Sequence, residues 1–230
     1  MKNIFVVTHT QSVHHVENKV GGWYDTELTP KGKADAQATA EKLVALIGNA
    51  SVEIFSSDLL RASQTAAIIA EHLKSPFETT DGLREISYGS AGGMPQEWLD
   101  ARQIPAPHHD RMDHRGGIAD GETRRELAER VYRAVDTIIS RPCPTQIIVT
   151  HGFALTFVIA AWIKMPIDSV GYVSFPASSG SITHLRQDDY WQNRGVIALA
   201  DVSHLKTSRD DVERGTLSDP LPQRFNVQPR

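Results

Sequence analysis

The chain has 230 residues, of which 40% are hydrophobic and 23% are charged, with a net charge of −4 and a single cysteine. This composition fits one globular domain, excludes a disulfide framework and lacks the basic stripe of a nucleic-acid-binding protein. The N-terminal segment has no apolar region of the signal-peptide type, and the longest apolar run, Phe153–Ile163, is too short to cross a bilayer. We therefore expect a cytoplasmic protein without a nucleic-acid or membrane partner.

The first half of the chain alternates short apolar runs with amphipathic segments. The predicted elements are a strand at Ile4–Val7, a loop over 13–28, a helix over 31–47, a strand at Val52–Ser56, a helix at Leu59–Leu73 and a short strand with a turn within 76–83. Residues 86–121 are rich in glycine, proline and polar residues, so they are predicted to form a long insertion with a short helix near Gln96–Arg102.

The second half continues this alternation. It predicts a helix at Glu122–Ile139, a strand at Gln146–Thr150, a helix at Ala154–Met165, and strands at Val170–Phe175, Ser181–Leu185 and Val196–Leu199. The polar segment 206–230 is predicted to be an extended or poorly ordered tail. Strands that alternate with helices indicate an α/β fold, in which a mostly parallel sheet carries helices on both faces as a three-layer sandwich. Residues 1–205 are expected to form this single domain.

Two predicted strands end in similar polar motifs. The stretch "VVTHTQS" places His9 directly after the first strand, and "VTHG" places His151 after the strand at Gln146–Thr150. A lone histidine at a strand end is usually satisfied by local hydrogen bonds. Ligands of such sheets bind at the carboxyl ends of the strands, however, and two imidazoles there can act as a nucleophile and as a donor to an anion.

An arginine and a glutamate also follow predicted strands. Arg61 lies in the first turns of a helix in "SSDLLRASQTA", and Glu85 lies at a strand-to-loop junction in "GLREISYGSAGG". Alone, they would be a solvated helix arginine and a surface carboxylate. Beside two histidines, Arg61 could hold two phosphate oxygens with its planar fork, and Glu85 could protonate a leaving oxygen.

These motifs resemble the histidine phosphatase superfamily, which has the phosphoglycerate mutase-like fold, and in particular its small broad-specificity and cobalamin-pathway phosphatases. The resemblance extends from Phe5 to about Leu205 and rests on the blocks "THTQS", "GWYDTELTPKG", "SSDLLRASQTA", "LREISYGSAGG", "GET", "IIVTHG" and "DVSHL". It implies that His9 is the nucleophile that forms a phosphohistidine, that Arg61 and His151 bind phosphoryl oxygens, and that Glu85 is the proton donor. It implies no metal and no cofactor.

The loop after the first strand departs from the family pattern. Thr8-His9-Thr10 replaces Arg-His-Gly, His15 replaces an asparagine, and Lys19 and Gly21 stand where the family often has arginine and glutamine. Changes confined to one loop favour a rebuilt pocket over decay. Thr8 and His15 are therefore candidate phosphate contacts, and Thr10 is a candidate residue of the substrate pocket.

Two further groups are candidates for the substrate pocket. Trp23 could line it, with packing in the core or at the rim as the alternative. His108 and His109 belong to a His/Asp cluster in the insertion, which lacks the fixed spacing of a zinc motif, so a solvated loop is favoured over a metal site. The resemblance implies that this lid-like insertion covers the active site, which makes both histidines candidates for contact with an anionic substrate.

The sequence predicts a metal-independent phosphatase of a small phosphorylated metabolite. A pseudo-phosphatase that binds an anionic ligand without turnover is the alternative, because the arginine at position 8 is missing. A phosphomutase is a weaker third reading, since the loop has lost positive charge. The substrate is not predicted, and a homodimer is left open.

Overall fold

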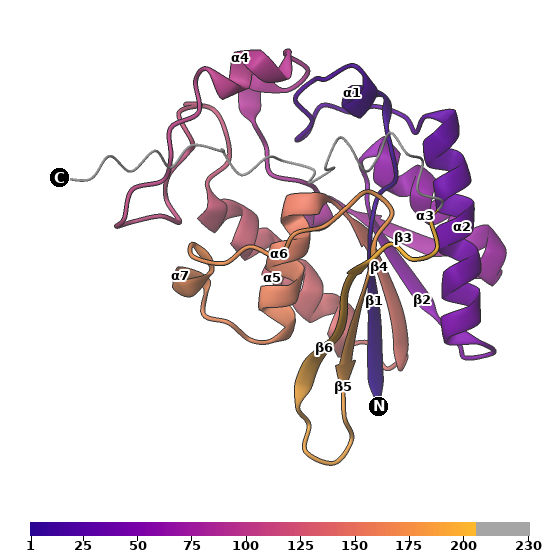
Figure 1. Ribbon diagram of the computed structural model, residues 1–230. Coiled ribbons are helices and arrows are strands. Elements are labelled where there is room, and N and C mark those ends of the chain that lie inside the picture. Colours follow the sequence, from indigo (N-terminus) through magenta and orange to yellow (C-terminus); the bar gives the residue numbers. More distant parts are fainter. Residues whose placement is uncertain (206–230) are drawn as a thin grey trace.

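The fold is built on a central six-stranded sheet within residues 1–205, the part of the chain that this computed structural model describes (Figure 1). The strands are β1 (Lys2–Thr8), β2 (Glu53–Ser57), β3 (Phe77–Thr80), β4 (Thr145–Thr150), β5 (Ile182–Gln187) and β6 (Arg194–Asp201), in the order β3-β2-β4-β1-β5-β6. Strands β3, β2, β4 and β1 are parallel, whereas β5 and β6 are antiparallel to their neighbours. The predicted α/β fold with a mostly parallel sheet is confirmed.

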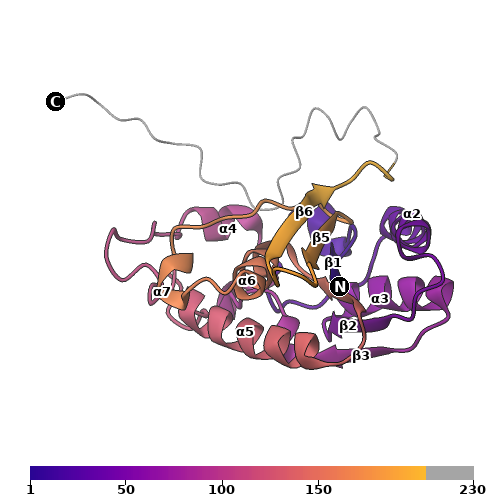
Figure 2. The same cartoon turned by 90° about the horizontal axis from the view of Figure 1, so that it is seen from below.

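Helices cover both faces of the sheet (Figure 2). One face carries α2 (Pro30–Ile47) and α3 (Leu60–Leu73), and the other carries α5 (Arg124–Ser140) and α6 (Gly152–Trp162). The shorter elements are the α-helices α1 (Val13–Val16), α4 (Gln96–Asp100) and α7 (Ile167–Val170) and the 3₁₀ helices η1 (Asp81–Leu83) and η2 (Gly89–Ala91). Helix α5 begins with a capping box in which Thr123 and Glu126 satisfy the first backbone N–H groups.

The alternation of side chains along β1 separates two hydrophobic cores. Ile4 and Val6 point into the core that α5 and α6 close, whereas Phe5 and Val7 point into the core beneath α2 and α3. All four side chains are buried, which explains why a strand covered on both faces is apolar throughout. A third small cluster packs Val20 against the insertion.

One predicted strand is wrong. Residues Val170–Phe175, expected to be extended from their apolar and aromatic residues, contain the last residue of α7 and then an irregular segment. Side chains take the hydrogen bonds that a strand partner would otherwise make, because Arg111 and Arg124 donate to the carbonyl of Gly171 and Thr156 accepts from the N–H of Phe175.

Other differences are small. Helix α1 forms a single turn inside the predicted loop 13–28, and β6 is longer than the predicted strand at Val196–Leu199. No helix within residues 1–205 is long and apolar enough to cross a membrane. The tail predicted at 206–230 lies outside the described residues.

The pairing of β1 with β4 determines where the two histidine motifs meet. The strands run parallel, with Thr8 opposite Thr150 at their carboxyl ends. The next residue of each strand is therefore His9 and His151, side by side at one edge of the sheet. The same edge receives Ser57 at the end of β2, which is the other neighbour of β4.

Candidate active site

His9 and His151 form the centre of the site. Their ring centroids are 5.0 Å apart, in an edge-to-face arrangement. Both rings are buried, and burial, followed by the charge of Arg61, lowers the pKa of each well below its usual value. The two imidazoles are therefore neutral at physiological pH.

Hydrogen bonds define the tautomer of His9. Its Nδ1 lies 2.8 Å from the carbonyl oxygen of Thr10 and donates to it, while its Nε2 accepts from Nε of Arg61 at 3.2 Å. The Nε2 lone pair consequently points toward the guanidinium. A neutral imidazole held in this way has the protonation state that nucleophilic attack requires.

Arg61 is fixed by its remaining donors. Its two terminal nitrogens donate to the carbonyl oxygens of Tyr24 at 3.0 Å and Gly22 at 2.6 Å. Burial lowers the pKa of Arg61 to about 10, while Glu85 and Asp25 oppose this shift by their charge. The guanidinium thus remains a buried cation at neutral pH, a suitable partner for phosphoryl oxygens.

One ring nitrogen of His151 is buried and has no hydrogen-bond partner among residues 1–205. Its Nε2 lies 2.8 Å from the hydroxyl of Ser57, which itself accepts the N–H of Leu59 at 3.3 Å. With Ser57 donating to Nε2, the ring carries its proton on Nδ1, which is buried and has no hydrogen-bond partner among residues 1–205. A buried donor without a partner is costly, so an anionic ligand oxygen at this position would stabilise it.

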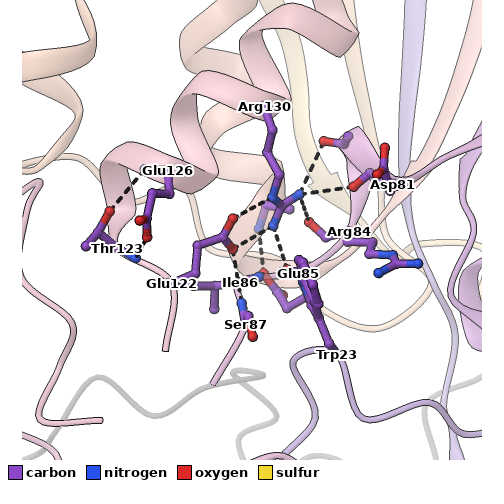
Figure 3. Close-up of polar contacts among 12 residues, drawn as sticks. Trp23, Asp81, Arg84, Glu85, Ile86, Ser87, Glu122, Thr123, Glu126 and Arg130 are labelled. Carbon is purple, nitrogen blue, oxygen red and sulfur yellow. Dashed lines mark hydrogen bonds and ion pairs between the residues drawn. The ribbon is translucent and has the colours of Figure 1, made fainter. Parts of the chain in front are cut away.

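Glu85 lies at the N-terminus of the helix that follows His151. Its carboxylate accepts the backbone N–H groups of Phe153 at 3.0 Å and Ala154 at 3.1 Å, in the first turn of α6. It also accepts its neighbour Ile86 N–H at 2.9 Å. Figure 3 shows Glu85 on its loop beside Trp23 and Arg130. Glu85 and His151 are thereby attached to one rigid element.

Two further histidines extend the site. His15 stacks on His9 with ring centroids 5.4 Å apart, and the ring centroids of His14 and His15 are 4.2 Å apart. Burial, then the charges of His15 and Arg61, lower the pKa of His14 to about 2; partial desolvation, then Arg61, lower that of His15 to about 4. Neither ring therefore supplies a positive charge to the ligand-free site at neutral pH.

The ring of His14 occupies space that a side chain at position 21 would need. A Cβ atom added to Gly21 would lie 2.7 Å from Nε2 of His14. Nδ1 of the same ring is held by the hydroxyls of Ser12 at 3.0 Å and Thr26 at 2.9 Å. Glycine at 21 and histidine at 14 therefore fit each other, because the ring leaves no room for a larger residue at position 21.

The hydroxyls of Thr8 and Thr10 are directed to backbone groups. Thr8 Oγ1 donates to the carbonyl of Ser178 at 2.6 Å and accepts the N–H of Ser181 at 3.2 Å. Thr10 Oγ1 donates to the carbonyl of Gly32 at 2.7 Å. Both residues are buried, so position 8 ties β1 to the loop before β5, and position 10 ties the site to the start of α2.

Of the three remaining candidates, Trp23 lies beside Glu85, whereas His108 and His109 lie on the insertion. Trp23 is partly exposed and donates from Nε1 to the backbone carbonyl of Glu85 at 2.7 Å. His108 and His109 are exposed on the insertion and make no contact with His9 or His151. Within residues 1–205, no group of three or more His, Cys, Asp or Glu side chains is arranged to hold a metal ion.

The sequence motifs did not indicate two features of the site. Ser57 orients His151 because β2 ends beside β4. The fit of His14 to Gly21 depends on how the loop folds back on itself. Neither feature has a residue pattern that a single sequence would reveal.

Comparisons with known proteins identify the family of the chain. The family model described as histidine phosphatase superfamily (branch 1) matches residues 4–196. The chain is similar to the probable phosphoglycerate mutases GpmB of Proteus mirabilis (29% identity over 227 residues) and of Salmonella arizonae (27% over 226 residues), in each case over 93% of this chain and 100% of the relative.

Solved structures share the fold of this chain. Bacillus stearothermophilus YhfR superposes with a TM-score of 0.72 at 28% identity, over 89% of this chain and 99% of that protein. A mycobacterial glucosyl-3-phosphoglycerate phosphatase in complex with VO3 shares the fold, with a TM-score of 0.72 at 24% identity over 87% of this chain and 99% of that protein. The chain belongs to branch 1 of the histidine phosphatase superfamily.

Proposed function

We propose that this protein is a phosphatase that hydrolyses a small phosphorylated metabolite through a phosphohistidine on His9. The observation that carries the proposal is the proximity of three groups: Nε2 of His9, the Arg61 guanidinium that donates to it, and the adjacent His151, whose Nδ1 has no partner among residues 1–205. Phosphoryl transfer requires a positioned nucleophile and donors around the equatorial oxygens, and these three groups supply both.

In the first step, Nε2 of His9 attacks the phosphorus and the ester P–O bond breaks. Arg61 and His151 donate to the phosphoryl oxygens, and the Glu85 carboxyl gives its proton to the leaving oxygen. In the second step, water attacks the phosphohistidine, the P–N bond breaks, and the Glu85 carboxylate takes the proton of the water. Phosphate leaves and His9 returns to its neutral form.

Trapping the intermediate tests this mechanism. The protein would be incubated with a panel of ³²P-labelled metabolite phosphates and quenched in alkaline detergent, because phosphohistidine is stable to base and labile to acid. We expect a protein-bound label that acid releases and that is absent from His9→Ala. Full turnover by His9→Ala would contradict the mechanism.

Two observations favour a second function, a pseudo-phosphatase that binds an anion without turnover. Position 8 offers no cation, and its hydroxyl is bonded to Ser178. His14 and His15, with pKa values of about 2 and about 4, do not replace the missing charge at neutral pH. Binding of labelled phosphate esters in equilibrium dialysis, without release of phosphate and without a trapped intermediate, would establish this function instead.

The names of the GpmB relatives make a mutase the third function to test. A mutase returns the phosphoryl group to a second hydroxyl of the same substrate skeleton, whereas a phosphatase gives it to water. ³¹P NMR of the reaction with a phosphoglycerate distinguishes the two, because only the phosphatase accumulates inorganic phosphate in proportion to the substrate consumed.

A further inference from the structure

The loop that carries Glu85 is held by an arginine of α5. Arg130, on α5, donates to four carbonyl oxygens of this loop: those of Asp81 at 3.4 Å, Gly82 at 3.3 Å, Arg84 at 2.7 Å and Glu85 at 2.6 Å. Figure 3 shows the guanidinium facing the loop from above. One side chain therefore contacts the backbone at four positions between η1 and Glu85.

Glu122 orients that guanidinium. Its two carboxylate oxygens accept Nε of Arg130 at 2.7 Å and a terminal nitrogen at 2.8 Å. The same carboxylate accepts the N–H of Ser87 at 3.1 Å, and the backbone N–H of Glu122 donates to the carbonyl of Ser87 at 2.8 Å. The Glu122–Arg130 pair thus binds the loop on both sides of Glu85.

The carbonyl of Glu85 is the point at which these contacts converge. It accepts from Arg130 and also from Nε1 of Trp23, which is 2.7 Å away (Figure 3). The position of its carboxyl group depends on this backbone position, because the side chain spans the short distance from the loop to the N–H groups of α6. A shift of about 1 Å in a catalytic group can lower a rate about 10²-fold.

Stability alone is a poor explanation of the pair. The side chains of Arg130 and Glu122 are only 14% and 9% exposed. Removing two charges from water is costly, and an apolar pair of similar volume often serves stability as well or better. An ion pair that also satisfies four carbonyl groups and one N–H group of the loop bearing the proton donor has a geometric role that apolar residues could not fill.

We propose that Glu122 and Arg130 are positioning residues that hold Glu85 in place to protonate the leaving oxygen. The inference rests on the proposed function, in which Glu85 is the general acid. It makes a specific claim about substrates: loss of the Glu122–Arg130 pair impairs the hydrolysis of esters whose leaving oxygen needs a proton. Esters with an acidic leaving group are largely spared.

The test compares kcat/KM for 2,4-dinitrophenyl phosphate, whose phenolate leaves without a proton, with that for an alkyl phosphate. Glu85→Gln provides the reference pattern. For Arg130→Gln and Glu122→Gln we expect the alkyl phosphate rate to fall on the order of 10²-fold and the dinitrophenyl phosphate rate to fall less than about tenfold. Arg130→Lys keeps the charge but cannot span both carboxylate oxygens and the carbonyls, so its loss is expected to be intermediate.

Arg141→Gln is the matched control. Arg141 follows α5 at its other end and also bridges two carboxylates, Glu53 at 3.1 Å and Glu78 at 3.0 Å, without contact with the Glu85 loop. We expect it to change both substrates equally. Suppose that Glu85→Gln loses more activity on the alkyl phosphate than on the dinitrophenyl phosphate, while every Arg130 and Glu122 variant loses the same on both. That result would overturn the positioning role and leave the proposed function intact. If Glu85→Gln loses the same activity on both esters, or if the wild type hydrolyses neither, Glu85 is not the general acid and the inference fails with it.

Discussion

Mild acid should destabilise the ligand-free protein, because three of its buried histidines have to stay neutral. Burial is the largest cause that lowers the pKa of His9, His14 and His151, in the case of His14 to about 2. In the unfolded chain each would titrate near its ordinary pKa of about 6.5. Below that pH the unfolded state binds more protons than the folded state, so stability is present above the unfolded pKa and is lost as the pH falls.

The magnitude follows from this difference in proton binding. Lowering the pH from about 7 to about 5.5 costs about 1.3 kcal/mol for each histidine that remains neutral when folded, or about 4 kcal/mol for the three together. This is a large share of the ~5–15 kcal/mol that stabilises an ordinary domain.

Urea denaturation followed by far-UV circular dichroism at the two pH values, at constant ionic strength, measures the effect. In His14→Asn the pH dependence should shrink by about 1.3 kcal/mol, because one buried imidazole is gone. Equal free energies of unfolding at both pH values, or the same dependence in His14→Asn as in the wild type, would refute the reasoning.

Two further predictions concern the altered loop. Thr8→Arg should raise kcat/KM for an aryl phosphate about tenfold to a thousandfold, the contribution of one oxyanion donor, and lower it for the native substrate, which needs the space. Thr8→Val, which loses the hydrogen bonds to Ser178 and Ser181 without gaining a cation, is its control; equal gains of Thr8→Arg on both substrates would disprove a rebuilt pocket. Gly21→Ala should cost about 1–3 kcal/mol of stability through overlap with the His14 ring. In a His14→Ala background, Gly21→Ala should lower the free energy of unfolding by at least about 1 kcal/mol less. Thermal or urea unfolding in which the effects of the two substitutions add would contradict the fit.

The positions of His9 and His151 show what a sequence can predict about this site. Each follows an apolar run that is covered on both faces of the sheet, and parallel strands deliver such residues to the same edge. The strands at Ile4–Val7 and Gln146–Thr150 were predicted correctly for this reason. The segment Val170–Phe175 has a similar composition but lacks a strand partner, and no local pattern records that absence.

The positioning contacts show where prediction from the sequence ends. Glu122 precedes α5 and Arg130 lies two turns into it, so the two residues do not have the spacing of three or four that pairs side chains on a helix. Only the fold brings the carbonyl groups around Glu85 against them. Likewise, histidine at 14 and glycine at 21 read as two unrelated loop residues until the loop folds back and the ring lies where a side chain would be.

The one-to-one register between β1 and β4 separates two kinds of sequence change. A residue inserted or deleted within either strand would turn the following histidine toward the opposite face of the sheet, since side chains alternate. Insertions in the segment 86–121 would leave this register untouched, because that segment lies between β3 and α5. Length variation in the insertion is therefore independent of the catalytic pair, because the paired backbone hydrogen bonds of two strands keep His9 and His151 together.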